Sequence, residues 1–470
     1  MLIRNSGIIL PNDHPDFEYI KRDLTIKQQM FTNNETKILK FYEQLNNSIL
    51  IPKYYPLDEP IQNELNNGVD INIESKIELR NDTQKKVVEY LTTNTHGIVK
   101  ALPGIGKTVC SIEMICRRKK KTLIIVHKKD LLNQWKDEIF RYTNITEDDI
   151  GVLTTQKSKY KNELDKSILL TTPHVIGIAV AKQKYDFIQC LKECGIGVLI
   201  ADELHSISGA ETFSKSCITI NAAVNFGLSA TPERPDETNK ILGYHFGDIV
   251  EFDVSEKDTI KPNIYIVKAD FGINRSNPRY INFSGRFDLS KYANQSKKSE
   301  KYNNLVLSLI KKCYNENRNT LIVGNYIKPL MHLAENCGAK KEDIGLFLPT
   351  ANKKDILKLS DTVNMKEAFL TKKLVFCTYM AVRDGNNRPD LDAAIMVLPT
   401  NNPIQLIGRL TRVLPNKKIP VVFDIVDTDS TIRKIWNNDS TVKVQKFEKA
   451  LEDRIEIYKN QNWPFKIINT

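Results

Sequence analysis

The amino-acid sequence predicts an α/β protein with two tandem parallel-sheet lobes, a small domain before them and a helix after them. At 470 residues, the chain is too long for one ordinary hydrophobic core. In two separate stretches, short apolar runs alternate with amphipathic segments, which is typical of parallel sheets with crossover helices. The hydrophobic fraction of 41% and the charged fraction of 27% are those of an ordinary globular protein.

Residues 1–78 carry mixed signals, and we expect a separate accessory domain there. Phe31 to Leu45 could form one helix, and the run ILIPKYYP reads as a strand that ends at proline. The first lobe is expected at residues 79–260, with helices such as Asp130–Tyr142 between its strands. Its five apolar runs are GIVKAL, TLIIVH, SILLTT, GVLIAD and FGLSAT.

The second lobe is expected at residues 261–435 and is joined to the first around Asp253–Lys261. The polar, weakly periodic segment Asn274–Lys301 predicts a surface loop or partial disorder. Residues 436–470 predict a charged helix, about Thr441–Lys459, followed by an aromatic tail. The five apolar runs of this lobe are NIYIVKA, TLIVGN, KLVFCT, AAIMVL and VVFDIV.

Composition excludes several classes of protein. No stretch reaches the roughly 18–20 apolar residues that cross a bilayer, and Pro11, Asp13 and Asp16 interrupt any signal-peptide pattern. The eight cysteines include no CxxC pair, so reduced thiols are expected rather than a metal site or disulfides. We therefore expect a soluble protein of the cytoplasm or of a host cell's interior.

The charge of the chain is compatible with a polyanionic partner. The formal net charge is +11, and a basic excess gains affinity for nucleic acid by releasing counterions from phosphates. Simple solubility explains the same charge equally well. The run Arg117 to Lys121 could be a nucleic-acid patch, but we favour a solvated helix end, where cations complement the helix dipole.

A glycine-containing loop follows the first strand of the first lobe. In GIVKALPGIGKT, Gly104 and Gly106 allow backbone N–H groups to approach phosphate oxygens at the start of the next helix. Lys107 would neutralise the β- and γ-phosphates, and the Thr108 hydroxyl would ligate Mg²⁺. Ala101 stands where the general GxxxxGK[ST] pattern has glycine, so a chance loop is the alternative.

Two acidic residues follow the strand GVLIA. Asp202 suits a magnesium ligand, and Glu203 suits orienting or deprotonating an attacking water. The plain alternative is a pair of acids at a helix start, worth about 0.3–1 kcal/mol. A phosphate loop about 95 residues upstream favours the catalytic interpretation.

The second lobe contains the segment QLIGRLTR, residues 405–412. Arg409 and Arg412 are three apart, so we expect them on one helix face, where an anion would offset their repulsion. A γ-phosphate across a cleft between lobes fits this arrangement, in the manner of arginine fingers. A surface pair of arginines is the alternative.

Together these segments resemble the superfamily 2 DExH helicases. Their first motif is commonly AxxGxGKT, which Ala101–Thr108 matches in full. The resemblance covers residues 79–427 and implies two RecA-like lobes that hydrolyse ATP with Mg²⁺. It assigns Arg80 and Gln84 to adenine recognition. Phosphate contacts fall to Pro103, Gly104, Ile105, Gly106, Lys107, Thr108, Val109 and Gly385, the metal to Thr108 and Asp202, and catalysis to Lys107, Glu203, Gln405, Arg409 and Arg412.

The same resemblance assigns residues to nucleic acid and to coupling. Nucleic-acid contacts would come from Lys128, Thr171, Thr172, Asn325 and Thr378, and coupling of hydrolysis to lobe movement from His205, Ser229, Ala230 and Thr231. The forms GLSATP and VVFDIVD look closest to the UvsW-like and XPB-like branch, including helicases of phages and large DNA viruses. The motif V sequence Asp384-Gly385-Asn386-Asn387, followed by Arg388, departs from the family pattern.

What the resemblance implies is an ATP-dependent DNA helicase or translocase, usually of 3'-5' polarity, on branched, forked or single-stranded DNA. Contacts to the phosphate backbone would give it little sequence preference. An RNA helicase or transcript-release ATPase would share every catalytic residue. A nucleotide-switched binding module is a second alternative, and residues 1–78 could bind DNA or a partner protein.

Overall fold

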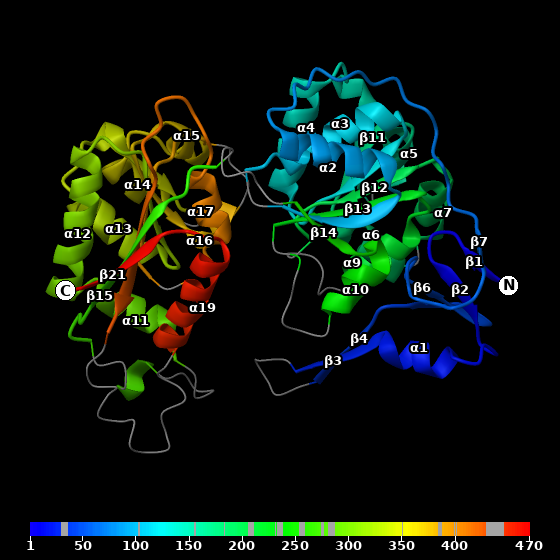
Figure 1. Cartoon of the computed structure of the whole chain (residues 1–470), viewed down its shortest axis with the longest axis horizontal. Coiled ribbons are helices and arrows are strands. Elements are labelled where there is room, and N and C mark those ends of the chain that lie inside the picture. The colour runs from blue at the N-terminus through cyan, green and yellow to red at the C-terminus, as the bar shows by residue number, and fades with distance from the viewer. Residues whose placement is uncertain are drawn as a thin grey trace. The chain divides into compact units, whose positions relative to one another are not determined.

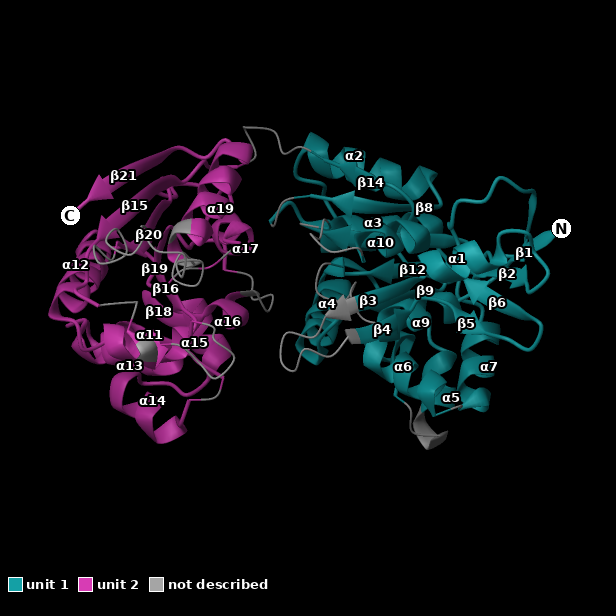
Figure 2. Cartoon of the chain, turned by 90° about the horizontal axis from the view of Figure 1, so that it is seen from below, with its two compact units in different colours: residues 1–254 teal, residues 255–470 magenta. Residues whose placement is uncertain are grey.

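The computed structural model divides the chain into two compact units, Met1–Val254 and Ser255–Thr470 (Figure 2). It describes all residues except 30–35, 102–103, 155–156, 183, 205–210, 231, 233–237, 253–258, 274–276, 281–286, 350, 384–387, 399, 401 and 429–445. Among the described residues, no helix is both long and apolar enough to cross a membrane.

The first lobe is built on a seven-stranded sheet in which all neighbouring strands are parallel. Its strand order is β10-β11-β9-β12-β13-β8-β14, and Figure 1 labels β11, β12, β13 and β14 of this sheet. The five central strands are the five predicted apolar runs, which confirms the α/β prediction; the two edge strands were not predicted. The strands are β8 (His96–Lys100), β9 (Thr122–Ile125), β10 (Ile150–Val152), β11 (Ile168–Thr171), β12 (Val198–Ala201), β13 (Val224–Ser229) and β14 (Ile249–Glu251).

Helices cover both faces of this sheet because its central strands present apolar side chains in both directions. Ile98 and Val99 on β8, for example, belong to separate hydrophobic cores. Helices α2, α3 and α4 pack on one face, and α5, α6, α7, α9 and α10 on the other. Their bounds are α2 (Asp82–Thr93), α3 (Lys107–Arg118), α4 (Lys129–Tyr142), η1 (Glu147–Asp149), α5 (Lys157–Leu164), α6 (Pro173–Ala181), α7 (Tyr185–Glu193), α9 (Glu211–Thr219) and α10 (Asn239–Phe246).

The N-terminal residues form a small sheet of order β5-β6-β2-β1-β7 and a separate hairpin, β3–β4. The predicted strand ILIPKYYP is confirmed as β6, but the predicted helix Phe31–Leu45 is wrong over its described residues. Burial there alternates, with Leu39 and Phe41 buried and Ile38 exposed, which is the period of a strand. The elements are β1 (Leu2–Arg4), β2 (Ile8–Pro11), α1 (Phe17–Asp23), β3 (Thr25–Gln29), β4 (Thr36–Lys40), β5 (Glu43–Gln44), β6 (Ser48–Ile51) and β7 (Ile61–Asn63).

Polar contacts fix this N-terminal part onto the first lobe. The buried Lys53 ammonium donates to Asn225 Oδ1 on β13 at 2.6 Å. Asp23 accepts hydrogen bonds from the hydroxyls of Tyr55, at 3.2 Å, and of Tyr244 on α10, at 3.0 Å. Residues 1–63 therefore pack on the two elements, β13 and α10, that precede and follow the Ser229-Ala230-Thr231 segment.

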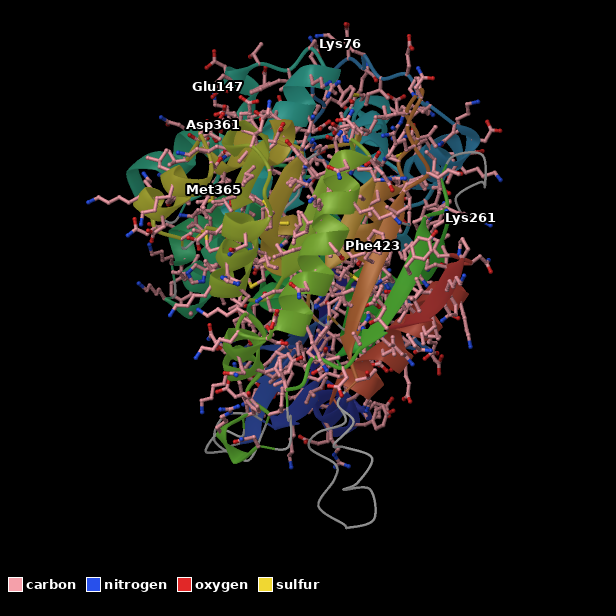
Figure 3. The ribbon with its side chains drawn as sticks, turned by 90° about the vertical axis from the view of Figure 1, so that its left-hand side faces the viewer. Lys76, Glu147, Lys261, Asp361, Met365 and Phe423 are labelled. Atoms are coloured by element: carbon pink, nitrogen blue, oxygen red, sulfur yellow. The ribbon has the colours of Figure 1, made fainter. Side chains whose placement is uncertain are left out.

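The second lobe repeats the architecture of the first. Its seven-stranded parallel sheet has the order β17-β18-β16-β19-β20-β15-β21, and again the five central strands are the predicted runs. Phe423 of β20 stacks on Tyr265 of the adjacent β15 (Figure 3). The strands are β15 (Asn263–Ala269), β16 (Thr320–Gly324), β17 (Ile344–Phe347), β18 (Leu374–Thr378), β19 (Ala393–Met396), β20 (Val421–Asp427) and β21 (Phe465–Asn469).

Two predictions for this lobe need correction. The segment Asn274–Lys301 is not only a loop, because its described part contains α11, and Tyr280 and Tyr292 are about 1% exposed in an aromatic cluster. The predicted C-terminal helix is present, but the tail after it is a strand, β21, that pairs with β15. The helices are η3 (Pro278–Tyr280), α11 (Leu289–Ser296), α12 (Glu300–Asn315), α13 (Ile327–Asn336), η4 (Lys341–Asp343), α14 (Lys353–Leu359), α15 (Met365–Thr371), α16 (Tyr379–Arg383), α17 (Ile404–Leu410) and α19 (Lys446–Asn460).

Replacing Lys53 by Met should change how the stability of the first unit depends on pH. Burial lowers the Lys53 pKa to about 7 from 10.5. Above pH 7 the unfolded chain therefore binds more protons here than the folded chain, and stability rises with pH toward 10.5 by up to about 1.4 kcal/mol per pH unit. Lys53→Met removes this contribution. Denaturant unfolding at pH 6.5, 7.5 and 8.5 should show the stability difference between variant and wild type shifting steadily in favour of wild type. Parallel pH profiles would contradict the burial of a titrating amine.

Candidate functional site

In the first lobe, the predicted functional residues lie at the carboxyl ends of parallel strands. The phosphate loop follows β8, Lys128 follows β9, Thr172 follows β11 and Asp202 follows β12, while Ser229 ends β13. Parallel pairing places all five ends at the same edge of the sheet, which is where open α/β sheets bind ligands. The fold therefore gathers residues that lie up to about 130 positions apart in the sequence.

The phosphate loop has the backbone of an anion-binding turn. Gly104 and Gly106 have φ of 92° and 91°, in the left-handed region that favours glycine. Gly106 caps α3, so the N-terminal end of this helix, with its positive dipole, lies at Lys107 and Thr108. The Lys107 ammonium donates to the Ala101 carbonyl at 2.7 Å, which places it inside the loop.

Gln84 stabilises this loop by a hydrogen bond to its backbone. Its Nε2 donates to the Ile105 carbonyl at 2.7 Å, and its Oε1 accepts from the Arg80 backbone N–H at 2.7 Å. Arg80 Nη2 lies 3.4 Å from the Gly104 carbonyl. A Cβ on Gly106 would approach Gln84 Nε2 to 2.7 Å, so the glutamine side chain would have to shift if this glycine were replaced. Gln84 thus shapes the phosphate loop; its predicted contact with adenine stays a prediction.

Beside the loop lies an acidic pair, in which Asp202 is buried and Glu203 is half-buried. Asp202 Oδ2 accepts from the indole N–H of Trp135 at 2.9 Å, and Oδ1 accepts from the Glu203 backbone N–H at 2.8 Å. Burial, and then the charge of Glu203, raise the pKa of Asp202 to about 6, while Trp135 and Lys107 oppose the rise. Glu203 has φ of 53°, in the left-handed region that residues other than glycine rarely adopt. Strained backbone conformations of this kind gather at functional sites.

Ser229 lies next to the first residue of the phosphate loop, Ala101. Strands β8 and β13 are neighbours, and the Ala101 N–H donates to the Ser229 carbonyl at 3.2 Å. Both Ser229 and Ala230 are buried. A movement of Ser229 would therefore act directly on Ala101 of the phosphate loop, and the reverse.

The predicted nucleic-acid residues of this lobe differ in exposure. Lys128 is half-buried at the start of α4, and Thr172 caps α6. Thr171 is fully buried, and its hydroxyl donates to the Thr172 carbonyl at 3.4 Å. Because the Thr171 side chain is buried, we expect a ligand to meet backbone groups of these two threonines rather than that side chain.

In the second lobe, the predicted residues also lie at strand ends and in α17. Asn325 follows β16, and Thr378 ends β18, where its hydroxyl accepts from the Ala381 N–H at 3.2 Å. Gln405 is half-buried and Arg409 is buried, both on α17.

The expectation that Arg412 shares a helix face with Arg409 is wrong. Helix α17 ends at Leu410, and Arg412 instead forms a bridge with Thr259. The helix stops shortly before Pro415, which cannot continue it. The two arginines are therefore held by different local structures.

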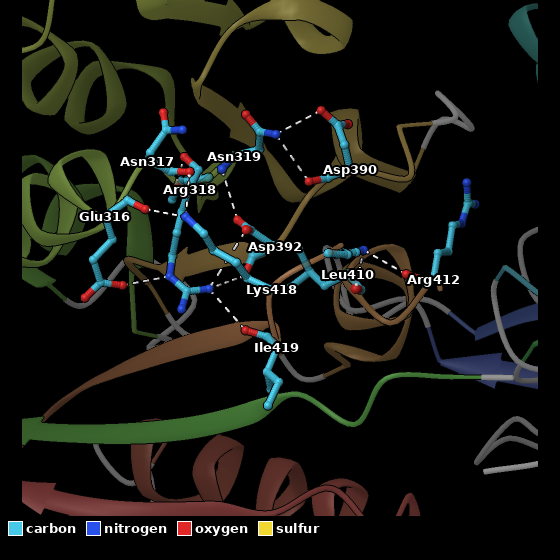
Figure 4. Close-up of polar contacts among 12 residues, drawn as sticks. Glu316, Asn317, Arg318, Asn319, Asp390, Asp392, Leu410, Arg412, Lys418 and Ile419 are labelled. Atoms are coloured by element: carbon cyan, nitrogen blue, oxygen red, sulfur yellow. Dashed lines mark hydrogen bonds and ion pairs between the residues drawn. The ribbon is translucent and has the colours of Figure 1, made fainter. Parts of the chain in front are cut away.

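Lys417 fixes the chain at this point. Its ammonium donates to the carbonyls of Leu410 at 2.7 Å, Pro389 at 2.8 Å and Arg412 at 3.0 Å. Figure 4 shows Leu410 and Arg412, together with the nearby contact of the Arg318 guanidinium with the Ile419 carbonyl, at 3.1 Å. Partial burial lowers the Lys417 pKa to about 8. Nothing in the sequence distinguished this lysine from a surface lysine, although it joins Pro389 to the end of the QLIGRLTR segment.

The unusual Arg388 also has a structural explanation. It is 3% exposed, and its guanidinium donates to the carbonyls of Phe369 and Lys372 and to the Asp390 carboxylate. The departure from the family pattern is therefore a clamp that anchors the chain after the motif V loop. The predicted residues Pro103, His205, Thr231 and Gly385 lie outside the described part of the chain.

Comparison with known proteins identifies the class. The family model described as "Type III restriction enzyme, res subunit" matches residues 72–234, which contain the phosphate loop and the acidic pair. A putative ATP-dependent RNA helicase of Acanthamoeba polyphaga mimivirus is 24% identical over 489 residues, covering 97% of this chain and 88% of the relative. These matches support a helicase of superfamily 2, a class of ATP hydrolases.

Further relatives support a position near the XPB-like branch. The DNA 3'-5' translocase XPB2 of Sulfurisphaera tokodaii is 29% identical over 180 residues, covering 38% of this chain and 36% of the relative. The structure of the DNA-bound Type ISP restriction-modification enzyme LlaBIII matches 84% of this chain and 31% of its own, with 15% identity and a TM-score of 0.54. This likeness confirms the fold of tandem RecA-like lobes.

Replacing Gln84 by Ala should weaken the binding of adenine and guanine nucleotides equally. The substitution leaves the buried Ile105 carbonyl without its donor, a cost of about 1–3 kcal/mol that falls on the loop rather than on the base. We expect ADP and GDP to lose affinity by the same factor in calorimetric titrations. The exposed Gln189→Ala on α7 serves as a control and should leave both affinities unchanged. A loss confined to ADP would instead support adenine recognition by Gln84.

Proposed function

We propose that this helicase is an ATP-driven DNA translocase of 3'-5' polarity that acts on branched or forked DNA. The observation that carries the proposal is the cluster of Lys107, Asp202 and Glu203 beside a glycine loop at one edge of the first sheet. The XPB2 relative, named a 3'-5' translocase on DNA, supports the polarity and the track. The net charge of +11 suits a polyanionic track.

Each residue of the first-lobe cluster has a role that its position supports. Lys107, at the start of α3, would bind the β- and γ-phosphates together with the loop N–H groups. Asp202 and the Thr108 hydroxyl would hold Mg²⁺, which prefers oxygen ligands and keeps several waters, so that few protein groups suffice. When bound, Mg²⁺ supplies charge that stabilises the transferring phosphoryl group. Glu203 would orient the attacking water and accept its proton.

The second lobe would complete the reaction with Gln405, Arg409 and Arg412. Guanidinium groups that reach the γ-phosphate only in a closed state would stabilise the transition state. Because the catalytic set is divided between lobes, hydrolysis would depend on lobe closure. Lys417 would then set the position of Arg412 through its carbonyl.

The track would be held through its backbone. Lys128, Thr172, Asn325 and Thr378 stand at or directly after strand ends in the two lobes. Lysine, hydroxyl and backbone N–H groups at such ends bind phosphates without reading bases. We therefore expect weak sequence preference and strong salt dependence.

RNA is the competing track, because the mimivirus relative is named an RNA helicase. An ATPase and strand-separation panel of forked DNA, a Holliday junction, tailed duplexes of both polarities, single-stranded RNA and an RNA–DNA hybrid separates the two. We expect the fork and the junction to stimulate most, and the duplex with a 3' tail more than that with a 5' tail. Stimulation by RNA alone would refute the DNA proposal.

Lys107→Ala and Glu203→Gln should each abolish nucleic-acid-stimulated ATP hydrolysis, because the first removes the phosphate cation and the second removes the group that orients the water. Phosphate release assays with forked DNA would detect a loss of 10²-fold or more, on the order that removal of such groups causes. Thermal melting should be near that of wild type. The exposed Lys85→Ala on α2 controls for loss of a lysine and should hydrolyse normally. Full turnover by either active-site variant would rule out the assigned roles.

A further inference from the structure

Trp135 lies on α4, outside the segments assigned to nucleotide chemistry. It is 1% exposed and is the largest fully buried side chain of the described residues. Its ring packs in the hydrophobic core between α3, α4 and the sheet. An indole in such a core still needs a partner for its N–H. That partner is Asp202 Oδ2, at 2.9 Å.

The two carboxylate oxygens of Asp202 accept hydrogen bonds from two different elements of the fold. The Trp135 indole reaches Oδ2 from a helix, and the Glu203 N–H reaches Oδ1 from the strand end itself, at 2.8 Å. The Glu203 bond is local, since it joins adjacent residues, and forms wherever the backbone takes its left-handed turn. The Trp135 bond spans 67 residues, so it forms only when α4 is packed on the sheet.

Orientation matters to a carboxylate that binds a small hard cation. Mg²⁺ demands near-octahedral geometry with short oxygen distances, so a carboxylate that rotates about its terminal torsion binds it poorly. Hydrogen bonds from surrounding groups fix the direction of a metal ligand, and their loss typically costs 10–100-fold in metal affinity or activity.

We propose that Trp135 is a positioning residue that holds the Asp202 carboxylate in the orientation required to bind Mg²⁺ with the nucleotide. The inference rests on the proposed function, in which Asp202 is a ligand of this ion. Its basis is the indole N–H bond to Oδ2, the burial of both groups, and the separate bond that holds Oδ1. Trp135 contacts neither nucleotide nor metal in this role and acts through Asp202 alone.

The first test compares Trp135→Phe with Trp463→Phe. Phenylalanine keeps an aromatic ring in the core but removes the N–H. Trp463 is also buried and lies in the second lobe, against Tyr458, so it matches the loss of an indole without touching the site. We expect the Mg²⁺ concentration for half-maximal ATP hydrolysis to rise on the order of 10–100-fold in Trp135→Phe and to stay unchanged in Trp463→Phe.

Binding of ADP in EDTA distinguishes positioning of the metal ligand from damage to the phosphate loop. We expect Trp135→Phe to bind metal-free ADP as wild type does, because the loop itself is intact. A Mg²⁺ requirement shifted no further than in Trp463→Phe would overturn the proposal. So would an equal loss of metal-free ADP affinity, since that would indicate general structural damage.

The second test leaves Trp135 in place and does not depend on hydrolysis. In the double variant Trp436→Phe/Trp463→Phe, Trp135 is the single tryptophan. Adding MgCl2 to its ADP complex should change the fluorescence emission of Trp135. The reason is that Mg²⁺ bound by the Asp202 carboxylate would alter the hydrogen bond that this carboxylate accepts from the indole N–H. Adding Asp202→Asn should remove this response. If the emission does not respond to MgCl2 although the protein hydrolyses ATP, the proposal for Trp135 is overturned. If the proposed function itself is wrong, the wild-type protein will instead show no ATP hydrolysis stimulated by nucleic acid.

Discussion

Parallel pairing of strands that are dry on both faces is the constraint on which the rest of the molecule depends. In each lobe the central strands have helices on both sides, so their side chains are almost all apolar. The polar residues of the candidate site stand where those strands end, whereas the buried Asp424 inside β20 is paired with Arg454. Because the strands run in one direction, their carboxyl ends share one edge. The phosphate loop, Asp202 and Ser229 meet there because of this geometry, although long stretches of chain separate them. The second lobe places Asn325 and Thr378 in the same way.

The cost of such a site is that its charged groups are buried. Burial raises the pKa of Asp202, and the strand end supplies compensation through the Glu203 N–H, the Trp135 indole and the nearby Lys107. Similar compensation is visible at the end of the QLIGRLTR segment, where Lys417 gives its three hydrogen bonds to backbone carbonyls. In both lobes, residues outside the assigned sites, Trp135 and Lys417, thus help to hold residues that the family motifs name. A buried polar group that lost such a partner would leave an unsatisfied atom, which is more costly than the bond itself is favourable.

The N-terminal residues follow a different rule. They contribute a mixed sheet and a hairpin rather than a strand of the first sheet, and they are joined to the lobe by a few polar contacts around Asn225 and Asp23. A buried lysine at such a junction costs stability, since its charge is desolvated. Apolar contacts with Ile241 and Tyr244 of α10 add to the junction, and the first unit, from Met1 to Val254, carries both the accessory residues and the nucleotide loop.

The sequence by itself determined the ten central strands, because a strand buried on both faces must be a continuous apolar run. It also located the phosphate loop and the acidic pair, whose chemistry requires particular residues at fixed local spacing. The edge strands β10, β14, β17 and β21 were missed because they are short or half-exposed, so their runs are weak. Only the tertiary structure decided what holds the site together. Trp135 and Asp202 lie 67 positions apart, and Gln84 and Ile105 lie 21 apart, so no local pattern encodes either pair. Arg412 left its expected helix because it pairs with Thr259, a residue from the far end of the same unit's sequence. Contacts of this kind depend on packing between elements, which chain spacing does not record.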